Sequence, residues 1–233
     1  PVAVLSSHLR PVSHYFRQNF SQVTNPPIDS LRESKVMSLK TRFGNLGNIL
    51  DFDNLTEENI YVLDSPILTN SQFKKFKKIF SKKIKTIDCT FEIKFSLKDR
   101  IEAIREECET AVREGSTALI LSDKNISKER ASIPTILAVG AIHSHLVKLG
   151  LRGYCSLNVE SSDALDTHSF AILIGVGATT VNPYLAIDSI HHRFEKKLFG
   201  KSDFASCVNK FKKSIDAGLL KIMSKMGISV LSS

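Results

Sequence analysis

Beyond residue 60, segments in which apolar residues recur with the period of a strand alternate with segments in which they recur with the period of a helix. This pattern predicts strands and helices in turn. Residues 59–63 are a short strand candidate. The T-x-x-Q sequence that begins at Thr69 predicts a helix start, because its hydroxyl and amide groups can satisfy free backbone N–H groups. The helix that follows places apolar residues on one stripe and lysines on the opposite side. The stripe consists of Phe73, Phe76, Phe80 and Ile84.

The alternation continues through the rest of the chain. Residues 85–95 alternate as a strand does, and Ser96 begins a second helix, which Gly115 ends. An almost fully apolar strand follows at 117–121, as expected where both faces of a sheet are covered. Further strands are predicted at 154–159 and 168–174. Further helices are predicted at 132–150, 182–200 and 204–217, and residues 219–231 fit a helix followed by a strand.

This order of elements predicts an α/β fold with a largely parallel sheet and flanking helices, either open or barrel-like. Residues 1–60 lack periodicity, so we expect an irregular N-terminal arm that packs on the core. Proline and glycine interrupt this arm at Pro11, Pro26, Pro27, Gly44 and Gly47. No apolar run approaches the roughly 20 residues of a membrane span, and the start has no signal-peptide pattern. We therefore expect a soluble cytoplasmic protein without a membrane partner.

The net charge of +8 is concentrated in two segments of the 233-residue chain. Residues 74–85 contain seven lysines and no acid, and a second basic segment spans residues 193–213. Lysines on a helix can attract the phosphates of a nucleic acid. The aromatic residues of this helix lie on its apolar stripe, however, and offer no stacking surface to bases. A solvated helix face is therefore favoured, no nucleic-acid partner is expected, and nucleic-acid binding through residues 74–85 is kept as a weaker alternative.

The cysteines and glycines give no strong motif. The four cysteines are scattered singly, which is typical of isolated buried thiols and not of a zinc ribbon or an iron–sulfur cluster. They are Cys89, Cys108, Cys155 and Cys207. Gly175 and Gly177 follow a predicted strand, but Thr180 stands where a dinucleotide-binding motif needs its third glycine. A tight strand-to-helix turn is the favoured interpretation.

The histidines are also weak site candidates. His143 and His145 lie two positions apart in a predicted helix, so they point in different directions and cannot chelate one metal ion. We expect one to be buried and the other exposed. His168 has Asp163 and Asp166 nearby in sequence, and a structural histidine is favoured over a site there. No metal site and no nucleophile motif is predicted.

Long strings along the whole chain carry a family resemblance. QVTNPPIDSLRE at 22–33 is the most specific, and SIPTILAVGAIHSHLVKLGLR and THSFAILIGVGATTVNPYLAIDSI follow at 132–152 and 167–190. LFGK and GLLKIMSKMGIS complete the series at 198–201 and 218–229. Together, in order and without large gaps, they resemble the central domain of the large subunit of glutamate synthase. The resemblance implies an α/β domain related to a partial (β/α) barrel.

The resemblance also implies an activity for the whole enzyme. In this family an amidotransferase domain releases ammonia from glutamine, and the ammonia crosses an internal tunnel to 2-oxoglutarate. Reduction of the imine then gives glutamate, so the enzyme is an oxidoreductase of nitrogen assimilation that acts on CH–NH2 donors. An FMN domain binds flavin, 2-oxoglutarate and an iron–sulfur cluster, and a small NAD(P)H-oxidising subunit or ferredoxin supplies electrons. The central domain is expected to connect these parts and to line the tunnel.

The same resemblance divides the chain and defines what it lacks. Residues 1–60 are the N-terminal arm, residues 61–217 the central α/β domain, and residues 218–233 the start of a truncated FMN-domain strand. Pro1 stands where the glutaminase nucleophile is a cysteine, and no cysteine cluster serves an iron–sulfur site. We therefore expect a fragment that is inactive alone, binds no cofactor itself and works with the amidotransferase and FMN domains. A non-catalytic remnant or interaction protein from a split gene is the alternative.

One motif of the arm is expected to reach the chemistry. By resemblance, the loop at 22–37 lies against the FMN domain near the 2-oxoglutarate pocket, and Met37 faces the substrate. A flexible thioether can line an apolar wall without adding charge. The interdomain residues of this loop are Pro26, Pro27, Asp29, Arg32 and Glu33. Alternatively, the prolines and Asp29 only fix a turn and Met37 packs in the core. Ser169 departs from the bulkier residue that usually follows His168 in the family, which leaves a role for this histidine open.

Overall fold

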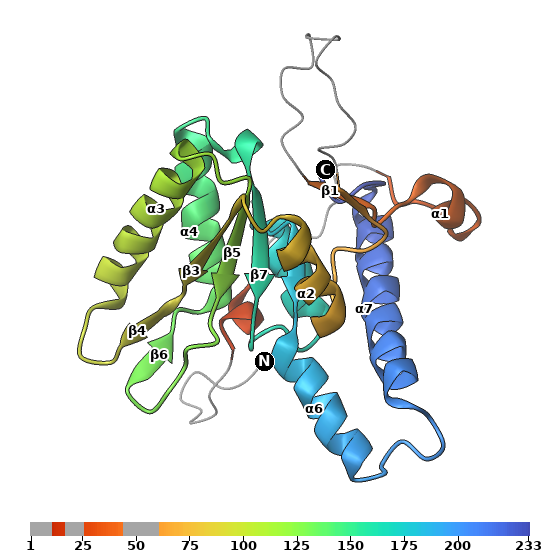
Figure 1. Ribbon diagram of the computed structural model, residues 1–233. Coiled ribbons are helices and arrows are strands. Elements are labelled where there is room, and N and C mark those ends of the chain that lie inside the picture. Colours follow the sequence, from red (N-terminus) through yellow and green to blue (C-terminus); the bar gives the residue numbers. More distant parts are fainter. Residues whose placement is uncertain (1–10, 17–25, 44–60) are drawn as a thin grey trace.

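A four-stranded parallel sheet in the order β3-β5-β7-β8 forms the centre of the protein (Figure 1). The computed structural model describes residues 11–16, 26–43 and 61–233. The strands are β3 (Ile84–Asp88), β5 (Ala118–Ser122), β7 (Ser156–Glu160) and β8 (Thr180–Asn182). A parallel bridge between Ile67 and Val181 extends the sheet beyond β8. The predicted α/β class with a largely parallel sheet is confirmed.

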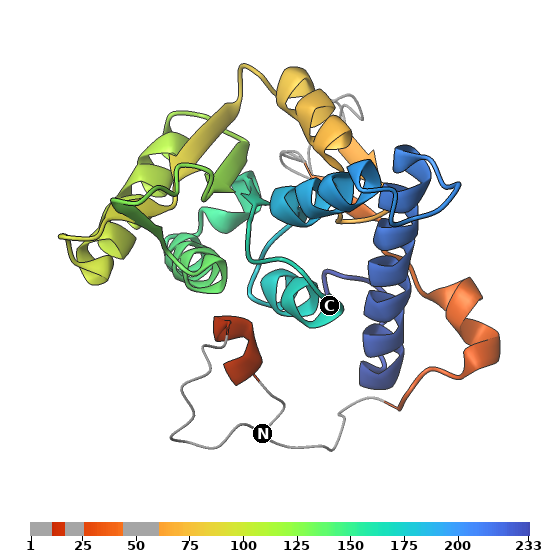
Figure 2. The ribbon, with the colours of Figure 1, turned by 90° about the horizontal axis from the view of Figure 1, so that it is seen from below.

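Helices cover both faces of this sheet, and the three that link successive strands lie on the same face (Figure 2). They are α3 (Leu97–Arg113), α4 (Thr135–Lys148) and α5 (Thr167–Gly175). Leu119, Leu121, Leu157 and Val159 belong to the core under these helices. On the other face α2 (Asn70–Ile79) packs Phe73 and Phe76 against Ala118 and Ile120. Neighbouring strands in chain order with linking helices on one face are the arrangement of a (β/α) barrel segment.

The remaining elements lie at the margins of the sheet. Two short antiparallel pairs join β1 (Thr41–Phe43) to β2 (Tyr61–Leu63) and β4 (Thr90–Glu92) to β6 (Arg130–Ser132). The helices outside the central layers are η1 (Val12–Tyr15), α1 (Ser30–Val36), η3 (Arg152–Tyr154), α6 (Tyr184–Glu195) and α7 (Phe204–Met226). No helix in the described ranges has both the length and the apolar content needed to cross a membrane.

The described part of the N-terminal arm packs on the C-terminal end of the chain. The Ile28 N–H donates to the Ser224 carbonyl at 3.0 Å, and the Ser38 N–H donates to the Ser229 carbonyl at 2.9 Å. These two bonds attach the described residues 26–43 to the C-terminal segment. Gly44 and Gly47 lie outside the described residues.

The predicted strand at 85–95 is divided in two, because the chain turns between β3 and β4. The Asp88 carboxylate accepts hydrogen bonds from the Thr90 N–H at 2.9 Å and the Thr90 hydroxyl at 2.7 Å, which holds this turn. Ile84 begins β3 and is not part of the helix, but it packs against the same apolar cluster as Phe73 and Phe76, as the predicted stripe implies. The capping box predicted from Thr69 and Gln72 is confirmed at the start of α2.

Residues 168–174, predicted as a strand, form α5 instead. The Asp166 carboxylate caps this helix by accepting the Ser169 N–H at 2.8 Å. An apolar run of this length does not distinguish a buried helix from a buried strand. Gly175 therefore ends α5 and Gly177 lies between this helix and β8, not in a turn from a strand to a helix as predicted. The sequence analysis missed β8, which contains Thr180.

Three helix ends differ from the predicted ones. α4 begins at Thr135 and not at Ser132, which lies in β6, and α6 ends at Glu195 and not near Gly200. α7 continues to Met226 instead of ending near Ala217. Residues 218–226, where an FMN-domain strand was expected to start, are therefore helical.

Candidate functional site

The carboxyl edge of the sheet carries a row of four polar side chains. Asp88, Ser122, Glu160 and Asn182 are register partners on neighbouring strands, and each is the last residue of its strand. Catalytic and binding groups of parallel α/β folds gather at this edge. The sequence analysis missed the row, although acids and amides at the ends of apolar strands were a signal for it.

Glu160 is the centre of this row. It is only 3% exposed, and its Oε2 accepts a hydrogen bond from the Ser122 hydroxyl at 2.7 Å. Its Oε1 pairs with Lys124 Nζ at 2.9 Å and with Lys77 Nζ at 3.4 Å. Burial acts to raise the pKa of Glu160, but hydrogen bonds from Lys124 and Ser122 outweigh it and hold that pKa below its ordinary value. The carboxylate is therefore ionised and fully paired.

Asp123 and Tyr184 form a second group beside Glu160. Asp123 is 2% exposed, and its Oδ2 accepts the N–H and the hydroxyl of Ser162 at 2.8 and 2.7 Å. Its Oδ1 has no hydrogen-bond partner among the described residues. Burial raises the pKa of Asp123, and burial together with the Asp123 charge raises the pKa of Tyr184. Lys124 Nζ lies 5.0 Å from the centre of the Tyr184 ring, which favours the ammonium ion there.

A buried polar network lies between this row and α2. Thr180 donates its hydroxyl to Asn158 Oδ1 at 2.7 Å, and Asn158 Nδ2 donates to Ser156 Oγ at 2.9 Å. Asn182 Nδ2 donates to the Leu68 carbonyl and to Asn70 Oδ1, both at 2.9 Å. The network satisfies its members internally, so it fixes the position of α2 on the sheet.

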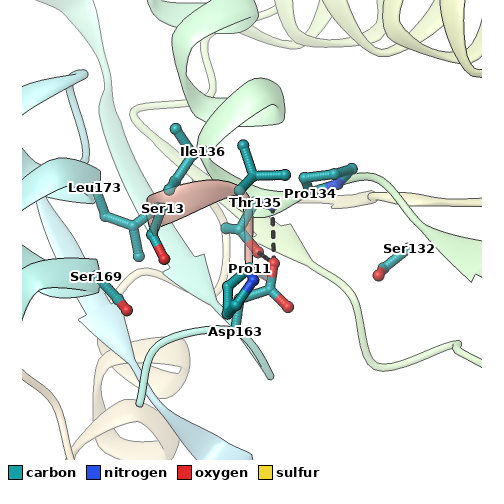
Figure 3. A pocket seen from close by; sticks show the side chains of 10 residues that line it. Pro11, Ser13, Ser132, Pro134, Thr135, Ile136, Asp163, Ser169 and Leu173 are labelled. Carbon is teal, nitrogen blue, oxygen red and sulfur yellow. Dashed lines mark hydrogen bonds between the residues drawn. The ribbon is translucent and has the colours of Figure 1, made fainter. Parts of the chain in front are cut away.

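A cavity of about 210 Å³ lies on the other side of the sheet edge, between η1 and the starts of α4 and α5 (Figure 3). Asp163 Oδ2 accepts hydrogen bonds from the Thr135 N–H and hydroxyl, both at 3.2 Å, and so takes the capping role predicted for Ser132. Ser13, Ile136 and Leu173 also line the cavity. Pockets for drug-sized ligands start at roughly 300 Å³, so this one is too small for a flavin or a dinucleotide.

α1, which contains Arg32 and Glu33, lies beside α7 (Figure 1). Asp29 caps α1 by accepting the N–H groups of Leu31 and Arg32 at 3.0 Å, as the turn interpretation predicts. Arg32 Nε pairs with Asp29 Oδ2 at 3.3 Å, and Pro26 and Pro27 are exposed.

The other two arm residues hold this segment to the rest of the protein. Glu33 Oε1 accepts a hydrogen bond from the Ser224 hydroxyl at 2.6 Å. Met37 is partly buried and packs against the main core. α1 itself has no buried residue, so the segment is attached at a few points along one side.

The histidines make structural contacts. His143 Nδ1 accepts from Arg152 Nε at 3.2 Å, and His145 Nε2 lies 2.9 Å from Glu109 Oε2. Both are half-buried, so the prediction of one buried and one exposed histidine is wrong. His168 Nε2 lies 2.9 Å from the Ser13 carbonyl, which agrees with a structural histidine.

The four cysteines are buried free thiols, as predicted. Burial raises the pKa of Cys89 to about 12, so its thiol stays protonated and unreactive. Within the part of the chain that the structure describes, no three histidine, cysteine or acidic residues are placed to hold a metal ion.

The fold and its edge define a class: an α/β domain with the strand order of a barrel segment, whose polar carboxyl edge is paired internally. The particular family follows from sequence comparison. The family model described as the glutamate synthase central domain matches residues 1–233, and the chain belongs to this family. It is 54% identical over 236 residues to the glutamate synthase [NADPH] large chain of Azospirillum brasilense, covering 100% of this chain and 16% of that protein.

Other relatives show the same relation of lengths. The ferredoxin-dependent glutamate synthase of Pyropia yezoensis is 41% identical, with 100% of this chain and 16% of that protein covered. The glutamate synthase [NADPH] large chain of Bacillus subtilis (strain 168) is also 41% identical, with 100% and 15% covered. The chain thus spans about one sixth of the length of these curated relatives. Among solved structures, a mutant flavocytochrome b2 with benzoylformate matches with a TM-score of 0.49 and 12% identity, covering 70% of this chain and 37% of that one.

Proposed function

We propose that this chain works as the connecting domain of a glutamate synthase, which makes glutamate from glutamine and 2-oxoglutarate by amide transfer and reduction. The observation that carries the proposal is the end-to-end match to large chains of which it forms only about one sixth. Its partners are then the amidotransferase and FMN domains of the same large chain and a small NAD(P)H-oxidising subunit. The assembly acts as a cytoplasmic oxidoreductase.

The described residues fit a connecting role better than a cofactor-binding one. The cavity of about 210 Å³ between η1, α4 and α5 is smaller than pockets for drug-sized ligands, and among the described residues the buried thiols form no metal-binding group. Glu160, the acid at the centre of the carboxyl edge, is already paired with two lysines. In this proposal FMN and the iron–sulfur cluster are bound by other parts of the enzyme, and the chain alone is expected to be inactive.

The arm supplies the contact nearest to the chemistry in this proposal. Pro26, Pro27, Asp29 and Arg32 are exposed and available to a neighbouring domain, while Glu33 attaches α1 to α7. Met37 is only partly buried, and in this proposal its exposed part faces the 2-oxoglutarate pocket of the FMN domain.

A chimeric enzyme tests the proposed function. This chain replaces the matching 16% of the Azospirillum brasilense large chain, and both glutamine hydrolysis and glutamine-dependent glutamate formation are measured. We expect the chimera to couple the two activities, and the isolated chain to show neither. A folded chimera that hydrolyses glutamine but forms no glutamate from it would contradict the proposal.

A matched pair of methionine variants tests the arm within the same chimera. Met37→Ala is expected to raise the KM for 2-oxoglutarate while glutamine hydrolysis stays unchanged. Met226→Ala is the control, because Met226 is 49% exposed at the end of α7. Equal KM values for the two variants would show that Met37 does not face the substrate and is only a core residue.

A further inference from the structure

Lysines are concentrated in α2 and in the segment that leads from it into β3. Residues 71–87 contain seven lysines and no acid. Phe73 and Phe76 turn inward from α2, so the lysines of the helix point outward. Lys77 pairs with Glu160, whereas the other six are exposed and make no ion pair with any described residue. These six are Lys74, Lys75, Lys78, Lys82, Lys83 and Lys85, and together with Ile79 they are called here the α2–β3 lysine surface.

Ile79 is an exposed apolar residue close to these lysines. Ile79 is 57% exposed in the last turn of α2, one helical turn after Lys75 and next to Lys78. A single exposed isoleucine is ordinary on a protein surface. An exposed isoleucine close to lysines that pair with no described residue also fits an interface, in which charged residues form the rim around an apolar contact.

The adjoining strand leaves an open edge beside these lysines. β3 pairs with β5 on one side only, and Lys85 and Thr86 in its middle are exposed. Lysines on an edge strand block pairing with a second copy of the same strand, because the two rows of positive charge repel each other. A partner with carboxylates does not meet this barrier. Figure 2 shows α2 on the outer side of the sheet, opposite the linking helices, where a partner can reach it.

We propose that the α2–β3 lysine surface docks an acidic protein surface carried by another domain of the assembled large chain. The inference rests on the proposed function, since the relatives carry more than five sixths of their length outside the matched region. Carboxylates supply the opposite charge, and an apolar side chain among them covers Ile79. The surface has no arginine and no exposed aromatic ring, the residues that favour nucleic acids through bidentate phosphate contacts and base stacking.

Lysine acetylation followed by mass spectrometry tests the inference in the chimera described above. We expect the six lysines to react about tenfold more slowly in the chimera than in the isolated chain, equivalent to about 1.4 kcal/mol of protection. Control lysines outside the surface, Lys98, Lys148 and Lys225, are expected to react at similar rates in both. High salt is expected to reduce the protection, because it screens exposed charges.

Two pairs of variants make the test specific. Reversing the charge at Lys75, Lys78 and Lys82 to Glu is expected to remove the protection of Lys83 and Lys85. The same reversal at the three control lysines is expected to leave it. Ile79→Ser is expected to weaken the protection as well, whereas Val147→Ser, at a residue 53% exposed, is the neutral control.

The outcomes separate the docking surface from the proposed function. If the chimera forms glutamate while the six lysines react as fast as in the isolated chain, the docking proposal is wrong and the function stands. If the lysines are protected but no glutamate forms, the docking proposal stands and the proposed function is wrong. If duplex DNA protects them in the isolated chain and the chimera does not, the surface binds nucleic acid and the docking proposal is also overturned.

Discussion

The charge on Glu160 is expected to contribute about 2 kcal/mol to the stability of the fold. Glu160→Gln keeps the size of the side chain and removes only the charge. The hydrogen bond from the Ser122 hydroxyl then changes from charge-assisted to neutral, which costs about 1 kcal/mol in a buried setting. The side chains of Lys77 and Lys124 are 38% and 50% exposed, so each lost ion pair adds only about 0.5 kcal/mol.

Urea unfolding followed by circular dichroism measures this loss directly. For a chain of this size, 2 kcal/mol corresponds to a fall in Tm of about 4–8 °C. Glu195→Gln is the matched control, because its side chain is 62% exposed and its change is expected to stay within about 0.5 kcal/mol. A double-mutant cycle with Lys124→Met isolates the ion pair and is expected to give a coupling of about 0.5 kcal/mol.

The pH dependence provides an independent check on the same carboxylate. Its pKa is lowered in the folded state, so its stabilisation is complete above the ordinary value of 4.5 and is lost as pH falls through the folded pKa. The difference between the wild type and Glu160→Gln is therefore expected to be largest at neutral pH and to shrink in acid. Equal urea midpoints at pH 7, or a difference that does not shrink in acid, would refute this account of Glu160.

Three further substitutions test separate parts of the structure. Burial raises the pKa of Asp123, so ionisation of this carboxyl group costs stability as pH rises through its pKa in the folded state. The Tm of Asp123→Asn is therefore expected to equal or exceed that of the wild type at pH 7 and to lose that advantage at pH 4. Gly177 has φ +119°, and an added Cβ would lie 2.4 Å from His143 Nδ1, so Gly177→Ala is expected to cost about 3 kcal/mol in urea unfolding. Gly153→Ala meets no atom within 4 Å and is expected to cost far less; equal costs would contradict the steric argument. Ser224→Ala is expected to speed amide exchange in α1 with little change in Tm, and unchanged exchange there would show that Ser224 does not hold the helix.

The sequence predicts elements well where the deciding interactions are local. Thr69 and Gln72 lie three residues apart and cap α2 as expected. The alternation of apolar strands with helices predicts the parallel sheet correctly. The turn at Asp88 was missed because the side chains alternate on both sides of it. α5 was mistaken for a strand because residues 170–174 form a continuous apolar run, and the Asp166 cap marks it as a helix.

The missed features depend on residues that are distant in the sequence. Asp163 caps α4 from 28 positions away, and Glu160 meets Lys77 across 83 positions. Such contacts exist only after the strands have been placed side by side, so no local pattern reveals them. The row of polar residues at the carboxyl edge was foreseeable in part, because parallel strands end at a common edge, but its pairing with α2 was not.

α2 covers one face of the sheet, and this explains why we expect the domain to act through contacts on its surface. In a (β/α) barrel the face opposite the linking helices is the interior, and the carboxyl edge opens to substrate. Here α2 covers that face, and the buried amides and hydroxyls form hydrogen bonds with one another. Glu160 is already paired with two lysines. A ligand at this edge would have to displace the two lysines that already neutralise the buried Glu160 carboxylate. No described residue pairs with the six lysines of the α2–β3 lysine surface, and the residues of α1 are not buried, so contacts with neighbouring domains are expected to form at these two places.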